Sequence, residues 1–298
     1  MTELWDSAVG LQRLANGGTW LEGPAWVDGR ILVSDIPGNR VLSWSEGAET
    51  FDVAIADAEY SNGRTVFRGG RVYQCSHGRR AVEELRPDLS TRVVTDRSPY
   101  GTRFNSPNDL VVARDGAIWF TDPPYGILKP EEGHPGELEY GECHVFRLSA
   151  TGELTTVVTN LSRPNGLAFS PDESVLYVSD TSDEPWQVWA YPVQDGECGE
   201  GRVFYTGRTG PIDGFRVDVE GRCWFSDGAS VAVTDSAGEV LDQIDVPERV
   251  ANLCFGPRGW LYLAATTTLY RLRTTTSDAA LVPSHLGATS EGGPFPSG

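Results

Sequence analysis

One segment of the chain occurs six times in recognisable form, and this repeat restricts the possible folds more than any other feature. Its clearest copy is RPNGLAFSPDESVLYVSD, from Arg163 to Asp180. Each copy has a polar residue, an alternating apolar run, a tight turn and a second alternating run. Equivalent apolar positions in successive copies are 38 to 58 residues apart. This period fits one β-propeller blade per copy better than the shorter helical or leucine-rich repeats.

Each copy divides into four short alternating runs, which predicts four antiparallel strands per blade. The first copy gives GPAWV, RILVSD, RVLSWS and ETFDV, with a hairpin turn at Asp28-Gly29 between the first two runs. The sixth copy lacks a fourth strand after Leu272, whereas Gly10 to Leu14 is an alternating run without a blade of its own. We therefore predict an all-β, six-bladed propeller whose last blade is closed by the N-terminal strand, because closure removes open sheet edges.

The unbroken repeat favours a single domain over residues 1–273, followed by a polar tail over residues 274–298 to which we assign no function. The N-terminal residues do not have the basic and apolar segments of a secretory signal. No apolar run approaches the roughly 18 residues of a membrane span, so we expect a cytoplasmic protein with no membrane partner. Five cysteines without metal-type spacing favour reduced thiols.

Charge limits the possible partners. The chain has 24 Lys and Arg against 42 Asp and Glu, a net charge of −18, with no basic cluster. Nucleic acid and anionic membranes require clustered positive charge, so both are disfavoured. Excess negative charge suits cation binding, although solubility alone would account for most of these carboxylates. The sequence does not indicate an oligomeric state.

Six polar residues align at the start of the first strand of each copy. They are Glu22, Asn62, Asn108, Asn165, Asp213 and Asn252. The first strands of propeller blades line the central channel, so these side chains should form a ring at one mouth. Burial of Glu22 and Asp213 there would cost several kcal/mol without a counter-charge, and no Lys or Arg occupies the other positions. A bound cation would compensate this cost.

Oxygen ligands dominate the ring, which favours one divalent metal ion, above all Ca²⁺. We predict Glu22, Asn108, Asn165 and Asp213 as its ligands, with open coordination positions for water or substrate. Mg²⁺, Mn²⁺ and Zn²⁺ are alternatives because availability in the cell competes with site preference, although the absence of His and Cys disfavours a zinc-type site. For Asn62 or Asn252 alone, a turn or capping role is the simpler interpretation.

Five motifs resemble those of one protein family. They are EGPAW from Glu22, RFNSPNDL from Arg103, FTDPPYG from Phe120, RPNGLAFSPD from Arg163 and IDGFRVD from Ile212. The chain resembles the gluconolactonase family, which includes regucalcin, and more distantly the diisopropyl fluorophosphatases. The resemblance extends over roughly Leu21 to Leu272. It implies a six-bladed propeller with a divalent metal, commonly Ca²⁺, at the channel mouth.

The resemblance also implies roles for individual residues. Glu22, Asn165 and Asp213 match the family's metal ligands, and Asn108 matches an additional ligand of the fluorophosphatase-like and bacterial lactonase branches. The motif positions of Arg103 and Asn105 match substrate contacts of the regucalcin-like branch, although the sequence departs from that motif after Asn105. Arg103 could also be an ordinary surface residue.

The predicted function is metal-dependent hydrolysis of sugar lactones, in which the cation polarises the lactone carbonyl and an activated water attacks it. Asp213 is the predicted catalytic residue, as metal ligand and assisting general base. One alternative is a phosphotriesterase in which Asp213 attacks directly, and another is a non-enzymatic metal-bound sensor or scaffold. The chain lacks a GxSxG motif, so a serine hydrolase is not supported.

Two further residues are predicted to bind substrate at the same mouth. His77, after the second strand of the second copy, could form the pocket wall or act as an acid or base. Asp122 precedes the long insertion over residues 123–143, a predicted substrate-selecting loop in which Tyr125 could stack on a sugar. However, Asp122 belongs to a column of strand-end residues whose simplest interpretation is turn formation. The insertion could equally be a passive surface loop.

Overall fold

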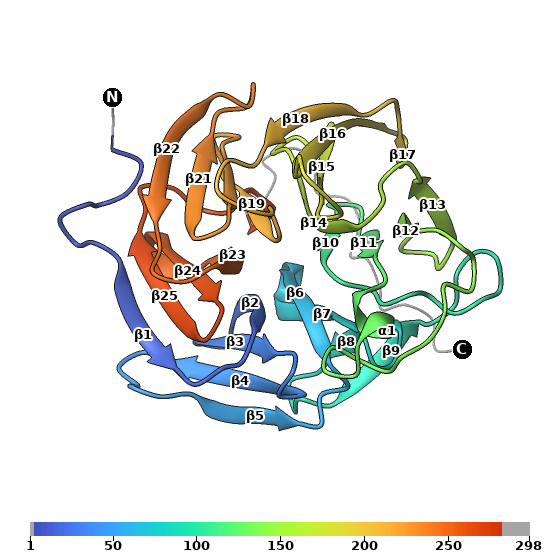
Figure 1. Cartoon of the computed structure of the whole chain (residues 1–298), viewed down its shortest axis with the longest axis horizontal. Coiled ribbons are helices and arrows are strands. Elements are labelled where there is room, and N and C mark those ends of the chain that lie inside the picture. Colours follow the sequence, from blue (N-terminus) through green and yellow to red (C-terminus); the bar gives the residue numbers. More distant parts are fainter. Residues whose placement is uncertain (1–2, 282–298) are drawn as a thin grey trace.

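The computed structural model describes residues 3–281, which form six antiparallel sheets arranged in a ring (Figure 1). The alternating runs of the sequence become these strands because each places one set of side chains against the neighbouring blade. The prediction of a six-bladed propeller with four-stranded blades is confirmed. No helix in the described part of the chain is long and apolar enough to cross a membrane.

Every blade begins at the channel and proceeds outward. Blade 1 comprises β2 (Leu21–Val27), β3 (Arg30–Asp35), β4 (Arg40–Ser45) and β5 (Asp52–Ala56). Blade 2 comprises β6 (Ser61–Phe67), β7 (Arg71–Ser76), β8 (Ala81–Leu85) and β9 (Thr91–Thr95), with the short 3₁₀ turn η1 (Arg68–Gly70) between its first two strands. Blade 3 comprises β10 (Leu110–Val112), β11 (Ile118–Asp122), β12 (His144–Leu148) and β13 (Leu154–Val158).

The second half of the ring repeats this order. Blade 4 comprises β14 (Pro164–Phe169), β15 (Val175–Asp180), β16 (Gln187–Gln194) and β18 (Arg202–Thr206), with β17 (Glu197–Cys198) beside β16. Blade 5 comprises β19 (Phe215–Val217), β20 (Cys223–Ser226), β21 (Ser230–Thr234) and β22 (Val240–Asp245). Blade 6 contains β23 (Val250–Phe255), η2 (Pro257–Gly259), β24 (Trp260–Ala265) and β25 (Thr268–Arg273).

The N-terminal strand closes the ring, as predicted. β1 (Gln12–Asn16) pairs antiparallel with β25, with Gln12 opposite Arg271 and Asn16 opposite Thr268. The Arg271 Nε donates a hydrogen bond of 2.8 Å to Gln12 Oε1. Blade 6 is therefore assembled from both ends of the propeller, and β25 is not left as an unpaired edge.

Large aromatic side chains fill the spaces between adjacent blades. Trp44 of blade 1 packs with Tyr262 of blade 6, and Trp119 of blade 3 packs with Phe169 of blade 4. Both tryptophans are 2% exposed. The apolar core is therefore distributed between the blades, which leaves the channel itself available for polar residues.

Residues 274–281, part of the stretch assigned to the tail, pack against the propeller. Asp278 forms a β-bridge with Asp218, and the Val219 N–H donates to the Ser277 carbonyl at 3.0 Å. The turn η3 (Ala279–Leu281) follows. Residues 282–298 of the proposed tail lie outside the described residues. All five cysteines are free thiols.

Candidate functional site

The six aligned polar residues lie together at one end of the inner strands. Four are within β2, β6, β14 and β23, while Asn108 and Asp213 lie two residues before the start of β10 and β19. None is more than 8% exposed. A cavity of about 580 Å³ opens over them and is lined by all of the ring except Asn252. The sequence repeat therefore identified the members of the ring correctly, and the four predicted metal ligands face a common cavity.

Glycines behind the ring residues bring the inner strands into close contact. A Cβ at Gly166 would lie 2.3 Å from the Asp213 carbonyl oxygen, and a Cβ at Gly214 would lie 2.0 Å from Asn252 Cγ. The Gly166 N–H instead donates to the Asp213 carbonyl at 3.2 Å. Only glycine permits this approach between blades. The sequence signal was a glycine directly after four of the six ring residues.

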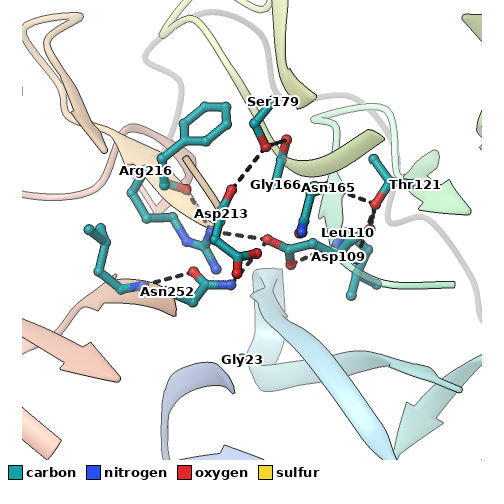
Figure 2. A network of polar contacts seen from close by, with 12 residues as sticks. Gly23, Asp109, Leu110, Thr121, Asn165, Gly166, Ser179, Asp213, Arg216 and Asn252 are labelled. Atoms are coloured by element: carbon teal, nitrogen blue, oxygen red, sulfur yellow. Dashed lines mark hydrogen bonds and ion pairs between the residues drawn. The ribbon is translucent and has the colours of Figure 1, made fainter. Parts of the chain in front are cut away.

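A buried polar network lies beneath the ring (Figure 2). The Asn252 side-chain NH₂ donates to Glu22 Oε2 at 3.1 Å. It also donates to Asp109 Oδ2 at 3.3 Å. Asp109 in turn lies 3.7 Å from the Arg216 guanidinium. Asn252 thus hydrogen bonds two buried carboxylates at once. Sequence reasoning missed Asp109 and Arg216, because neither occurs at a repeated offset.

Negative charge is concentrated at this end of the channel. Burial raises the pKa of Glu22 well above its ordinary value, and the carboxylates of Asp213 and Asp109 raise it further. Burial also raises the pKa of Asp213 to about 7, although the Arg249 cation opposes this shift. These buried acids favour either protonation or a bound positive charge.

The donor set fits a hard cation. Glu22, Asn108, Asn165 and Asp213 offer only oxygen ligands and line the same cavity. The buried Asn62 Oδ1 beside them has no hydrogen-bond partner. Within residues 3–281, no group of three or more His, Cys, Asp or Glu side chains is placed to hold a metal ion. A cation here would therefore depend on amide as well as carboxylate oxygens.

His77 forms part of the cavity wall with both ring nitrogens engaged. Its Nδ1 lies 2.9 Å from the Glu132 carbonyl, which can only accept, so the proton is on Nδ1. Nε2 then accepts from the Asn62 side-chain NH₂ at 3.0 Å. Burial lowers the pKa of His77 to about 4. A neutral imidazole with these partners suits a wall residue better than a proton acceptor.

The other three predicted substrate-binding residues do not line the cavity. Asp122 accepts the backbone N–H of Asn105 at 2.7 Å and the Tyr140 hydroxyl at 2.6 Å. Asn105 is fully buried and donates through its side chain to the Glu142 carbonyl. Arg103 donates to the Arg79 carbonyl at 3.0 Å. The structure gives these residues loop-holding contacts and does not bring them to the ring.

Asp122 belongs to a set of four aspartates that hold loops by their backbone. Asp35, Asp122, Asp180 and Asp227 each end or follow the second strand of a blade and accept N–H groups from the loop that enters the same blade. The donors include Thr19, Ser106, Arg163 and Thr209. This arrangement agrees with the turn-forming interpretation of the column.

The insertion over residues 123–143 contributes Tyr125, Lys129 and Glu132 to the cavity wall. Tyr125 begins the short helix α1 (Tyr125–Leu128), and its hydroxyl hydrogen bonds with Thr181 of blade 4. Gly126 packs directly on His77, where a Cβ would lie 2.5 Å from the His77 Cβ. The insertion therefore bridges blades 2 and 4 at the edge of the cavity.

Two cavity residues lie outside every pattern in the sequence. Arg249 precedes β23, and Trp20 precedes β2. The Arg249 Cζ lies 5.1 Å from the centre of the Trp20 ring. Neither occupies a ring position of the repeat, so no periodic signal could have identified them.

Together, fold and site define a six-bladed β-propeller with an acidic, oxygen-lined cavity at one end of its channel. The family described as the SMP-30/Gluconolactonase/LRE-like region matches residues 20–268, and the chain belongs to this family. The resemblance to the gluconolactonase family noted in the sequence is thereby confirmed.

Several relatives carry the names of lactonases. The chain is 33% identical to a gluconolactonase of Zymomonas mobilis, in a match that covers 91% of this chain and 83% of the relative. It is 29% identical to the pentonolactonase XacC of Haloferax volcanii, over 79% and 77% of the two chains. A gluconolactonase structure from Xanthomonas campestris has a TM-score of 0.84 and 40% identity, and 89% of each chain is covered.

Proposed function

We propose that the protein hydrolyses sugar lactones to the corresponding hydroxy acids. The observation that supports this most directly is the convergence of Glu22, Asn108, Asn165 and Asp213 on one cavity. The cavity, about 580 Å³, has the size of a small-molecule site. The lactonase relatives match this chain over most of its length, which favours the same class of substrate here.

The four cavity-facing oxygen donors are also the residues we propose to hold a divalent cation, with Ca²⁺ first and Mg²⁺, Mn²⁺ or Zn²⁺ as alternatives. When bound, such a cation supplies Lewis-acid polarisation of the lactone carbonyl. Asn252, the ring residue that does not line the cavity, donates a hydrogen bond to the Glu22 carboxylate, which fixes the direction of that carboxylate. The unpaired Asn62 Oδ1 offers a further acceptor at the cavity wall.

Asp213 is the proposed proton acceptor. As water attacks the carbonyl carbon, one of its protons passes to the Asp213 carboxylate. The ring C–O bond then breaks, and the departing oxygen takes the proton back from Asp213 to become a hydroxyl, which restores the carboxylate. The position of Asp213 at the cavity wall and its burial in a polar ring suit this role, whereas neutral His77 is already engaged at both nitrogens.

Proton release from a panel of aldonolactones tests the proposal. The protein is stripped with chelator and then supplied with Ca²⁺, Mg²⁺, Mn²⁺ or Zn²⁺ in turn. We expect activity to disappear on stripping and to return with at least one ion. If the protein binds a cation tightly but opens no lactone with any ion, lactone hydrolysis is the wrong function.

A further inference from the structure

Arg249 is a cation in the cavity wall whose hydrogen-bonding capacity is unused. Its guanidinium forms no hydrogen bond or ion pair with any of residues 3–281, and its Nε is buried without an acceptor. An arginine side chain offers five N–H donors in a fixed plane. By contrast Lys129, another cation of the wall, has the Glu132 carboxylate 3.5 Å away.

The backbone and the neighbouring ring hold Arg249 in place. Its carbonyl accepts the Thr266 N–H at 2.9 Å, and the preceding Glu248 accepts the Thr267 N–H at 2.6 Å. The guanidinium stacks over Trp20 of the adjacent blade at 5.1 Å. Arg249 is thus positioned where blades 6 and 1 meet, at the edge of the cavity.

A positioned guanidinium with free donors is suited to an anionic oxygen group, because its two parallel N–H groups match a carboxylate. The carboxylates of the ring are not the anionic partner of Arg249, since none in the described chain is within ion-pair distance of its guanidinium. Lactone opening, on which this inference rests, creates a carboxylate in the same cavity.

We propose that Arg249 binds a carboxylate of the ligand. This group is either the carboxylate formed by ring opening or an acidic substituent carried by the lactone. The first case makes Arg249 a determinant of product retention, and the second makes it a determinant of substrate selection.

Cation-loaded wild-type protein is compared with Arg249→Met and Arg249→Lys. Inhibition by gluconate reports binding of the product carboxylate. The ratio of kcat/KM for glucarolactone, which carries a second carboxyl group, to that for gluconolactone reports binding of a substituent. We expect Arg249→Met either to weaken inhibition by gluconate or to lower the ratio of kcat/KM values, by about tenfold or more. This is the usual scale for a hydrogen bond to a charged group.

Arg249→Lys keeps the positive charge near Asp213 but lacks the two parallel N–H donors of the guanidinium. It should therefore lose part of the carboxylate binding without a change in the pH profile for gluconolactone. Arg202→Met, on the exposed outer strand of blade 4, is the matched control and should behave as wild type. If gluconate inhibition and the lactone ratio are both unchanged in Arg249→Met, the inference is wrong.

Calorimetric titration with gluconate separates this inference from the proposed function. Should wild-type protein open no lactone but bind gluconate in an Arg249-dependent manner, lactone hydrolysis fails and the carboxylate site stands. Absence of gluconate binding, or equal binding by wild-type protein and Arg249→Met, would overturn the carboxylate site in such a protein.

Discussion

Asp213 is the residue at which the buried negative charge and the proposed chemistry coincide. It lines the cavity, and its backbone carbonyl accepts hydrogen bonds from Gly166 N and Ser179 Oγ, which fixes it against blade 4 (Figure 2). Its side chain is therefore held by a backbone that cannot shift without disturbing two blades.

Asp213→Asn should retain the fold and lose activity. The amide has nearly the same shape but cannot take up a proton, so we expect kcat/KM for gluconolactone to fall by about 100-fold or more. Stopped assays with saturating cation measure this, with circular dichroism as a check on folding. The exposed Asp245→Asn serves as the matched control and should keep full activity. An Asp213→Asn protein with bound cation and wild-type rates would contradict the catalytic assignment.

His77 should make stability depend on pH in a defined window. Its pKa in the folded protein is about 4, below its ordinary value of 6.5, so between these values the unfolded chain binds more protons. This contribution therefore leaves stability intact above about pH 6.5 and lowers it as pH falls toward 4, by up to about 3 kcal/mol. Urea unfolding of wild-type protein and His77→Gln, compared from pH 7.5 to 5, should show a smaller loss in the variant. If the free energy of unfolding falls equally with pH in both proteins, His77 does not cause the loss.

The sequence identified the ring because each of its six members stands nine to eleven residues before an equivalent apolar position of the repeat. Asp109, Arg216 and Arg249 each matter through contacts with residues far away in the chain, and a single sequence does not encode such contacts as a pattern. Asn105 and Asp122 show the converse: their motif was recognisable, but their side chains are engaged in holding a loop.

Among the elements, the inner strands are those whose packing most directly sets the site. β14 and the start of β19 approach so closely that Gly166 has no space for a side chain. The alternation of apolar residues predicted nearly every strand, because blade packing buries one face of each. It could not predict how the insertion over residues 123–143 docks, since that depends on contacts such as Gly126 on His77.

Gly166→Ala should separate blades 4 and 5. The added Cβ would lie 2.3 Å from the backbone oxygen of Asp213, which cannot rotate away, so we expect a loss of about 2 kcal/mol or more in the free energy of unfolding. Activity should fall as well, because Asp213 must move. Gly136→Ala is the control, since its nearest neighbour is the end of the Arg80 side chain at 3.4 Å. Equal stability of the two variants would show that the contact between Gly166 and the Asp213 carbonyl tolerates an added Cβ.

The molecule as a whole is a closed ring with excess negative charge at one end of its channel. Closure by β1 was predictable because the sixth repeat lacked a strand and the N-terminus supplied one. The contacts of residues 274–281 with blade 5 could not be predicted, since that segment has no apolar periodicity and no counterpart in the repeat.

Cation binding should stabilise the whole protein, and more so at higher pH. The pKa of Asp213 is about 7 in the folded protein, above its ordinary value. The contribution of Asp213 to the free energy of unfolding is therefore fully present below about pH 4 and is lost as pH rises through 7. Added Ca²⁺ should offset this loss, by about 2.7 kcal/mol at 100 times its Kd. Thermal unfolding at pH 5 and pH 8, with chelator or Ca²⁺, measures it. The same Ca²⁺ shift at both pH values, or in Asp213→Asn, would contradict the proposed site.

The four loop-holding aspartates have a consequence for evolutionary change. Asp35, Asp122, Asp180 and Asp227 receive backbone N–H groups from the loops at the mouth, and every residue except proline can supply that donor. Mutations can therefore alter the side chains of these loops while the anchoring bonds persist. New substrate preferences can therefore arise by exchange of side chains around the mouth, while the backbone hydrogen bonds that anchor the loops are kept.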